Sequence, residues 1–241
     1  MNPGTAALER GLRALDALAE HDRSGDGLGV VRLAALLGAD KTQISRTLAT
    51  LEAHGLVERD AATLAYRLGY RLFALAARVS ERRLLTAAPP VLRALVADLG
   101  ESAHLSVRQG TQVLTLLSES PAASIHAPGR VGSLVPLATT SAGRVLVADL
   151  AEAELDGLGL GGARAAIARA RLDGVAIVRE EFEPGLVAAA APVRDGGGRV
   201  VAAVNVSAPA FRFADRLDEA AGAVERAAGT LSATLAGARG A

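Results

Sequence analysis

The chain has 241 residues, of which 50% are hydrophobic and 2% are aromatic, and its formal net charge at pH 7 is zero. This length and composition allow one or two folded domains with apolar cores, and they exclude an extensively disordered chain. The zero net charge gives no overall basic field for nucleic acid, and the absence of cysteine excludes disulfides, thiolate nucleophiles and cysteine-based zinc sites.

Apolar residues recur at helical spacing in residues 5–21, which predicts a first helix. Residues 22–29 are rich in Gly and Asp and predict a turn, after which a short second helix over 30–37 stops at Gly38. The pattern so far is typical of a small helical domain.

A third helix is expected between Asp40 and Gly55. Asp40 is placed to be its N-cap, Gln43 is placed to complete a capping box, and Gly55 suits the left-handed C-terminal position. Short strands are then expected at 56–60 and 64–68, joined by residues 61–63. Three helices followed by such a hairpin predict a winged helix-turn-helix.

The third helix has one apolar and one polar face. At 100° per residue, Ile44, Leu48 and Leu51 turn toward the core, while small and hydrogen-bonding side chains occupy the opposite side. A helix that enters the major groove needs donors of this kind in its N-terminal turns. The alternative is a solvated helix face, but the surrounding helices and hairpin favour binding to double-stranded DNA. The expected DNA-binding residues are Lys41, Thr42, Gln43, Ser45, Arg46 and Thr50 of the helix, with Arg59 and Arg67 of the wing.

Several segments together resemble the IclR-type bacterial transcriptional regulators. They are "ALERGLRALDALAEH", "LAALLGADKTQISRTLATLEAHGLVERD" and "YRLG" in the first part, and "LATTSAGRVLVADL" and "EEFEPGLVAAAAPVRDGGGRVVAAVNVS" in the second. The resemblance implies a winged helix-turn-helix over 1–68, a linker helix over 69–85, and a GAF-like α/β domain over 86–241 that binds an effector and forms oligomers. It also implies homodimers, often paired into tetramers.

The pattern after residue 68 fits a mixed domain of helices and a mainly antiparallel sheet, so the predicted fold class is α+β. Residues 69–83 have helical spacing, and Pro89-Pro90 is interpreted as the start of a helix over 86–100. Further strands are expected at 103–108, 113–117, 124–126, 175–178, 187–194 and 199–207, and further helices at 139–150, 164–171 and 214–235.

No catalytic motif is found, and no enzyme activity, cofactor or metal is predicted. The four histidines, His21, His54, His104 and His126, are scattered. A metal site made from His104 and His126 is conceivable, but isolated histidines on strands are more often structural. Glu180 and Glu181 are adjacent and are interpreted as a solvated acidic turn, because neighbours on an extended segment point to opposite sides.

The sequence also gives no reason to expect a membrane protein. The N-terminus lacks the pattern of a signal peptide, and the longest apolar run, near residues 186–193, is too short to span a bilayer. We therefore expect a cytoplasmic protein without a membrane partner.

A ligand pocket is predicted at one face of the strand over 199–207. Alternation places Val201, Ala203, Asn205 and Ser207 on one face, and Val200, Ala202, Val204 and Val206 on the other. Asn205 and Ser207 are polar groups at the end of an apolar face, as in many small-ligand pockets, although a solvent-facing strand end gives the same pattern. The family resemblance favours the pocket.

The resemblance also implies that the effector, a small organic acid, lies at the start of the helix matching "TTSAGRVLVADL", where N–H groups favour a carboxylate. The residues implied there are Thr140, Ser141, Ala142 and Gly143, with Gly185 and Ala188 from the "EEFEPGLVAAAAPV" segment. Ala188 and Val178 stand where several members carry Cys and an acidic residue, which disfavours a very small effector. The chain is more similar to the subgroup that senses protocatechuate and para-hydroxybenzoate, with Leu134 where that subgroup often has Arg.

Two hypotheses follow from the sequence. The first is a dimeric or tetrameric transcription factor whose affinity for operator DNA is controlled by a small, aromatic or medium-length, organic acid. The alternative is a small-molecule-binding enzyme or sensor that uses its helix-turn-helix only as a protein-interaction module.

Overall fold

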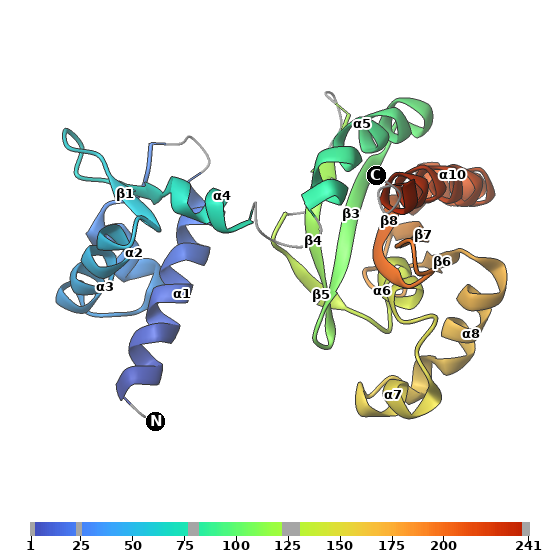
Figure 1. The fold of residues 1–241 in the computed structure, drawn as a ribbon, viewed down its shortest axis with the longest axis horizontal. Helices are drawn as coiled ribbons and strands as arrows, with labels where there is room; N and C mark the ends of the chain where they lie inside the picture. The colour runs from blue at the N-terminus through green and yellow to red at the C-terminus, as the bar shows by residue number, and fades with distance from the viewer. Residues whose placement is uncertain (1–2, 23–25, 77–81, 122–130, 238–241) are drawn as a thin grey trace. The chain divides into compact units, whose positions relative to one another are not determined.

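The computed structural model describes residues 3–22, 26–76, 82–121 and 131–237. Its internal contacts divide the chain into two compact units, residues 1–82 and 83–241 (Figure 1). Each unit has its own hydrophobic core, and each is described separately.

The N-terminal unit is a winged helix-turn-helix, as predicted. It contains α1 (Pro3–His21), α2 (Val30–Leu37), α3 (Lys41–Ala53), the antiparallel strands β1 (Val57–Arg59) and β2 (Tyr66–Leu68), and α4 (Tyr70–Ala76). Leu18, Leu33, Ile44, Leu48 and Tyr66 are buried together and hold the helices against the wing. Gly38 and Gly55 both adopt the left-handed conformation, with φ of 59° and 67°, and so allow the turns that follow α2 and α3.

The start of α3 differs in one detail from the prediction. Asp40 is the N-cap, because its Oδ1 accepts from the N–H groups of Thr42 and Gln43 at 2.8 and 3.2 Å. These two bonds lower the pKa of Asp40, and the bond from the Gln43 N–H has the larger effect. The expected capping box is wrong, since the Gln43 side chain accepts from Arg10 of α1 instead of returning to Asp40.

The C-terminal unit is built on a six-stranded antiparallel sheet of order β5-β4-β3-β8-β7-β6. The strands are β3 (Ser102–Gln109), β4 (Gln112–Glu119), β5 (Leu134–Pro136), β6 (Ala176–Arg179), β7 (Leu186–Arg194) and β8 (Val200–Pro209). The helices are α5 (Arg82–Leu99), α6 (Ser141–Leu146), α7 (Glu152–Gly157), α8 (Arg164–Asp173), α9 (Ala210–Phe213) and α10 (Leu217–Ala236), with 3₁₀ turns at Gly161–Ala163 and Ala214–Arg216. This mixture of helices and antiparallel sheet confirms the predicted fold class.

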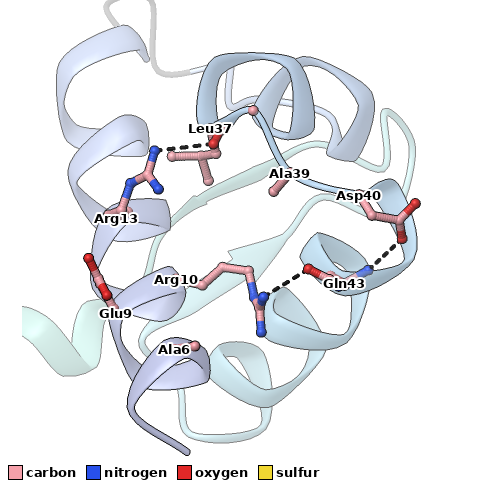
Figure 2. Close-up of a pocket in the computed structure, with 9 residues that line it drawn as sticks. Ala6, Glu9, Arg10, Arg13, Leu37, Ala39, Asp40 and Gln43 are labelled. Atoms are coloured by element: carbon pink, nitrogen blue, oxygen red, sulfur yellow. Dashed lines mark hydrogen bonds between the residues drawn. The ribbon is translucent and has the colours of Figure 1, made fainter. Parts of the chain in front are cut away.

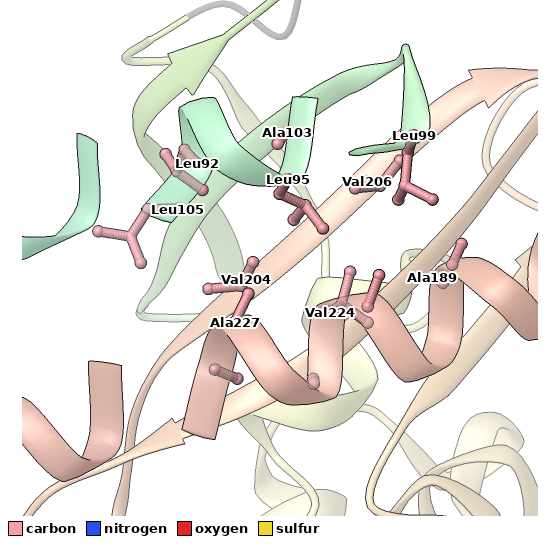
Figure 3. Close-up of a cluster of buried hydrophobic side chains, with 14 of the residues drawn as sticks. Leu92, Leu95, Leu99, Ala103, Leu105, Ala189, Val204, Val206, Val224 and Ala227 are labelled. Carbon is pink, nitrogen blue, oxygen red and sulfur yellow. The ribbon is translucent and has the colours of Figure 1, made fainter. Parts of the chain in front are cut away.

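Two apolar layers cover the two faces of this sheet. On one face α5 and α10 pack against β8 through Leu92, Leu95, Val204, Val206 and Val224 (Figure 3). On the other face α6 and α8 pack against the sheet through a separate cluster that includes Val145, Ile167, Ala190 and Ala203. Alternate residues of β7 and β8 therefore serve opposite cores, and the polar residues among them are available to line a site.

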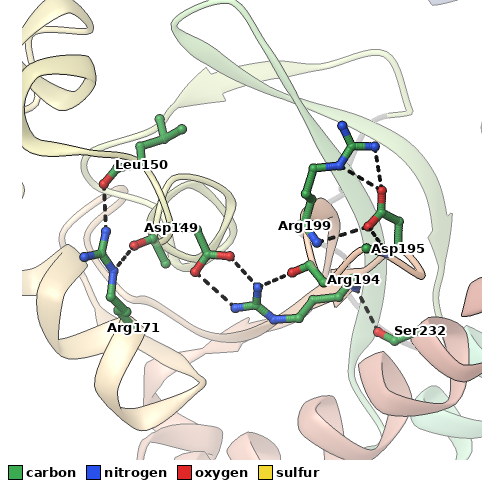
Figure 4. Close-up of polar contacts among 10 residues, drawn as sticks. Asp149, Leu150, Arg171, Arg194, Asp195, Arg199 and Ser232 are labelled. Carbon is green, nitrogen blue, oxygen red and sulfur yellow. Dashed lines mark hydrogen bonds and ion pairs between the residues drawn. The ribbon is translucent and has the colours of Figure 1, made fainter.

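Polar contacts fasten the chain after α6 to the sheet and to α8 (Figure 4). Arg171 of α8 donates to the carbonyl oxygens of Ala148 and Leu150, and Arg194 of β7 pairs with Asp149. The Arg194 backbone N–H donates to Ser232 Oγ of α10 at 2.9 Å. The bonds of the Arg171 and Arg194 side chains hold the segment after α6 to α8 and β7, and the bond to Ser232 joins β7 to α10.

Several predicted elements need correction. Pro89 and Pro90 do not start a helix: they lie inside α5, where the buried stripe Leu84, Ala88 and Leu92 packs strongly enough to offset the hydrogen bonds that proline removes. Strand β5 was not predicted, and the strand expected at 124–126 lies outside the described residues. The helix expected over 139–150 is the shorter α6, and α7 follows it.

A β-bulge changes the faces at the start of β8. The register shifts between Val193 and Arg194, so that Val193 pairs with Ala202 and Arg194 pairs with Val200. Val201 therefore packs in the cluster with α5 and α10, and Val200 packs in the cluster with α6, the reverse of the predicted faces for these two residues. From Ala202 to Val206 the predicted alternation is correct.

Candidate nucleic-acid interface and ligand pocket

One side of α3 forms a continuous exposed polar surface. Ile44 and Leu48 are buried, whereas the six residues predicted from the helix to bind DNA are all exposed: Lys41, Thr42, Gln43, Ser45, Arg46 and Thr50. This is the arrangement that a recognition helix needs, with its core side fixed and its donors free to approach base edges and phosphates.

The first helix holds α3 and the end of α2 in place (Figure 2). Arg10 donates to Gln43 Oε1 at 2.8 Å, and Arg13 donates to the carbonyl oxygen of Leu37 at 3.1 Å. Arg10 therefore bonds a side chain of the predicted recognition surface, whereas Arg13 bonds a backbone carbonyl oxygen at the end of α2.

The wing arginines lie on opposite faces of the β1–β2 hairpin. Arg67 is paired across the strands with Glu58, and their side chains form an ion pair with an N–O distance of 3.4 Å. Arg59 is opposite Tyr66, and its guanidinium carbon lies 5.5 Å from the centre of the Tyr66 ring. Both arginines are exposed, but the negative charge of Glu58 lies beside Arg67 and opposes the approach of a phosphate to it.

A pocket of about 300 Å³ opens in the C-terminal unit between the sheet and α6. Its polar lining consists of hydroxyl, amide, imidazole and carboxylate groups, from Ser106, Thr115, Ser133, Thr140, Ser141, Ser207, Asn205, His104 and Glu183. Its apolar lining is Val113, Val135, Ala142, Val178, Phe182, Leu186 and Ala188. An apolar wall with a few placed polar groups is the usual form of a small-ligand site.

His104 lies at the centre of a hydrogen-bonded row across three strands. Its Nδ1 is 3.0 Å from Ser118 Oγ and its Nε2 is 3.1 Å from Ser207 Oγ. The side chain is 4% exposed, and burial lowers the pKa of His104 to about 4. At neutral pH it is therefore an uncharged imidazole that gives one ring nitrogen as donor and the other as acceptor.

The start of α6 is fixed from two sides. Thr140 is its N-cap, and the Thr140 hydroxyl accepts from the Gly143 N–H at 3.1 Å. Arg144, 7% exposed, donates to the Ala138 carbonyl oxygen and forms a bidentate pair with Glu181. Glu181 is thus an ion-pair partner of α6 and not simply a solvated turn residue, while Glu180 closes the turn by accepting from the Gly185 N–H at 2.8 Å.

Of the residues expected at the effector, six line this pocket and three do not. Thr140, Ser141, Ala142, Ala188, Asn205 and Ser207 are in the lining. Gly143 packs against the chain at Leu137, where an added Cβ would lie 2.2 Å from the carbonyl oxygen, so its role is close packing. Gly185 forms a left-handed turn with φ of 79°, and Ala203 is buried in the α6 core.

Much of the pocket lining could not be predicted from the sequence, because it comes from strands that meet only in the folded sheet. His104 and Ser106 alternate along β3, and Val113 and Thr115 alternate along β4, but only the sheet order shows that their faces meet Asn205 and Ser207. Leu134, singled out by the resemblance, is 45% exposed, while its neighbours Ser133 and Val135 line the pocket. An acidic side chain that the sequence did not predict at the pocket, Glu183 of the turn after β6, is also in the lining.

Comparison with known proteins identifies the family. The model of the IclR helix-turn-helix domain matches residues 7–61, and the model of the bacterial transcriptional regulator IclR C-terminal domain matches residues 76–160 and 162–233. The chain belongs to the IclR family of bacterial transcriptional regulators.

Individual IclR relatives resemble the chain over most of its length. The HTH-type transcriptional regulator BhcR of Paracoccus denitrificans is 31% identical over 97% of this chain and 88% of its own length. The HTH-type transcriptional repressor AllR of Salmonella typhi is 28% identical over 88% of this chain and 83% of its own. An IclR homologue from Microbacterium hydrocarbonoxydans, crystallised with 4-hydroxybenzoate, has the same fold, with a TM-score of 0.80 at 21% identity over 96% and 100% of the two chains.

These findings make the chain a DNA-binding transcriptional regulator and set aside the alternative of an enzyme, because the family and its curated members are regulators. Within the described residues, no group of three or more His, Asp or Glu side chains is arranged to hold a metal ion. No helix in the same part of the chain is both long and apolar enough to cross a membrane.

Proposed function

We propose that this IclR-family regulator binds operator DNA through the exposed face of α3 and the wing, and that a small organic acid in the pocket beside α6 controls this binding. The observation that carries the proposal is the pocket itself, in which buried Ser141 and the polar ends of Asn205 and Ser207 face one apolar cavity. A cavity of about 300 Å³ suits an aromatic or medium-length acid better than a two-carbon one.

The ligand carboxylate is expected at the start of α6. The Gly143 N–H is already bonded to the Thr140 hydroxyl, so the groups proposed for the carboxylate are the N–H of Ser141, the N–H of Ala142 and the Ser141 hydroxyl. Because α6 has six residues, these individual hydrogen bonds matter more than its dipole. The hydroxyl of Ser207, which is hydrogen-bonded to the neutral His104, and the amide of Asn205 are placed to bond a second polar group of the ligand.

The carboxylate of Glu183 narrows the chemical class of ligand that the pocket is expected to bind. A second carboxylate on the ligand would meet the negative charge of Glu183, whereas a hydroxyl would find an acceptor there. We therefore propose a monocarboxylic acid that carries a hydroxyl group and an apolar body, the latter lying against Phe182, Leu186 and Ala188. The hydroxybenzoate bound by the Microbacterium hydrocarbonoxydans relative belongs to this chemical class and is a starting compound for a screen.

Thermal-shift screening of hydroxylated aromatic acids and dicarboxylic acids tests the pocket. A ligand at 100 times its dissociation constant adds about 2.7 kcal/mol to the folded state. Ser141→Leu and Asn205→Leu are expected to abolish the shift and to leave operator binding in place. Thr234→Ala is the matched control, because this exposed hydroxyl on α10 bonds only to the Thr230 carbonyl oxygen within the described contacts. A shift that survives both leucine substitutions places the ligand elsewhere.

We also infer a homodimer, or a tetramer of two dimers, in which α4 takes part. Tyr70, Phe73 and Leu75 are 81%, 76% and 51% exposed on this short helix, and an apolar surface of this kind commonly packs against another subunit. Sedimentation of the wild type and of Phe73→Asp tests it: a lower oligomeric state in the variant is expected, and an unchanged mass contradicts the role of α4. Since its DNA target lies in the bacterial cytoplasm, the protein is expected to act there.

A further inference from the structure

Arg10 of α1 connects to α3 through a closed hydrogen-bond network. Its Nη1 donates to Gln43 Oε1 at 2.8 Å, and its Nε donates to Thr47 Oγ1 at 3.3 Å. The Thr47 hydroxyl in turn donates to the Gln43 backbone carbonyl oxygen at 2.9 Å. Figure 2 shows Arg10 reaching from α1 to the Gln43 side chain at the start of α3.

This network fixes which way the Gln43 amide faces. A guanidinium group has only N–H donors, so the group that meets Arg10 must be the amide oxygen and not the amide nitrogen. The amide is planar, and its Nε2 therefore points away from Arg10. Because Gln43 is exposed, the group that it offers to an approaching DNA molecule is the Nε2 donor.

We propose that Arg10 is a specificity-determining residue that acts through Gln43, although it lies outside the recognition helix. A free glutamine amide recognises adenine with two bonds, accepting from N6 with its oxygen and donating to N7 with its nitrogen. Arg10 takes one of the two lone pairs of Oε1, and its positive charge beside the other disfavours the N6 donor of adenine, so the second bond to adenine is weakened. Nε2 then favours bases by the acceptors that they present in the major groove: guanine offers O6 and N7, thymine offers O4, and adenine offers only N7 beside its N6 donor.

The inference rests on the DNA-binding surface proposed above, and it adds a base preference at one position. Arg13 gives a matched control from the next turn of α1. It donates to the Leu37 backbone carbonyl oxygen at 3.1 Å, and the hydrogen bonds of the described residues include none from Arg13 to a side chain of α3. Its loss therefore disturbs the anchoring of α2 without releasing the Gln43 amide.

Selection of binding sequences from a random DNA pool tests the proposal, with the full-length wild type, Arg10→Met, Arg13→Met, Gln43→Ala and the double variant Arg10→Met/Gln43→Ala. At the position where Gln43→Ala loses selectivity, the wild type is expected to prefer guanine or thymine. Arg10→Met, which frees the amide, is expected to shift that position toward adenine by about tenfold, the size of one good base contact. Arg13→Met is expected to keep the wild-type preference, and the double variant is expected to match Gln43→Ala.

Arg10→Lys is the control that separates release of the Gln43 amide from a general loss of structure in Arg10→Met. Lysine keeps a donor for Gln43 Oε1 and is expected to keep the wild-type base preference. The proposal is overturned by a wild-type preference for adenine at the Gln43 position, or by an Arg10→Met profile equal to that of the wild type. If the wild type enriches no sequence at all, the DNA-binding surface proposed for α3 is wrong, and this inference fails with it.

Discussion

The two units of the molecule build their sites in different ways. The polar surface of the N-terminal unit comes from a single stretch, Lys41 to Thr50, and all of its side chains point outward from one helix. The pocket of the C-terminal unit takes its lining from α6, the turn before β7 and every strand of the sheet. The first site depends on one helix and its anchors, whereas the second depends on the order and register of six strands.

The sites also differ in their electrostatics. The arginines of the recognition surface and wing are exposed, so salt screens them and their bonds to phosphate release counterions. In the pocket, burial keeps His104 neutral and its hydrogen bonds directional. We therefore expect the salt concentration to change the affinity of the first site for DNA, and pH to change the stability of the unit that holds the second.

Arg46→Ala tests the recognition surface and has the largest expected effect. If Arg46 pairs with a base edge, its loss costs roughly 1–3 kcal/mol of specific binding, while nonspecific binding falls less. Electrophoretic mobility shift at fixed salt measures both. Arg226→Ala is the control, since Arg226 is an exposed arginine on α10 of the other unit. Equal operator affinities of Arg46→Ala and the wild type would remove Arg46 from the interface.

His104→Gln tests the buried pocket through pH. Because the folded-state pKa of His104, about 4, lies below the ordinary value of 6.5, the unfolded chain binds its proton first as pH falls. The contribution to stability is complete above pH 6.5 and is lost progressively between pH 6.5 and 4. Between pH 7 and pH 5 the wild type should lose about 2 kcal/mol more than His104→Gln in urea unfolding. If both proteins lost the same free energy of unfolding between pH 7 and pH 5, His104 would be protonated in the folded state at pH 5.

Arg59→Ala and Arg67→Ala compare the two faces of the wing. Log affinity falls as log salt concentration rises. Removing an arginine that contacts a phosphate is expected to make this negative slope shallower by about one unit. Because the charge of Glu58 partly offsets that of Arg67, Arg67→Ala is expected to weaken DNA binding less than Arg59→Ala at low salt. Anisotropy titrations over a range of salt concentrations measure both quantities. Unchanged slopes in both variants would exclude the wing from the interface.

Glu183→Gln tests the charge at the pocket and has the smallest expected effect, because Glu183 is exposed. Removing its charge is expected to strengthen the binding of a dicarboxylic acid by about two- to fivefold, and to change the binding of a monocarboxylic hydroxy acid less. Calorimetric titration of the two ligands into wild type and variant gives the comparison. A larger gain for the monocarboxylic acid would contradict the role given to Glu183.

The same contrast explains what the sequence could predict. The period of Ile44, Leu48 and Leu51 defines the buried side of α3 without knowledge of any other element, and Asp40 marks where the helix begins. Pocket residues on β8 were partly predictable from alternation, but the bulge at Val201 and the register that places His104 beside Ser118 and Ser207 depend on long-range pairing. The helix α5 through Pro89 and Pro90 shows tertiary packing overriding local preference.

The most direct test of the central claim is the operator affinity of the full-length protein with and without a ligand that the thermal-shift screen identifies. We expect the ligand to change the dissociation constant for operator DNA by about fivefold or more, and operator DNA to change the ligand's dissociation constant by the same factor. In Ser141→Leu, operator binding is expected to remain and the ligand effect to disappear. A ligand that stabilises the wild type through this pocket but leaves its operator affinity unchanged would contradict the account.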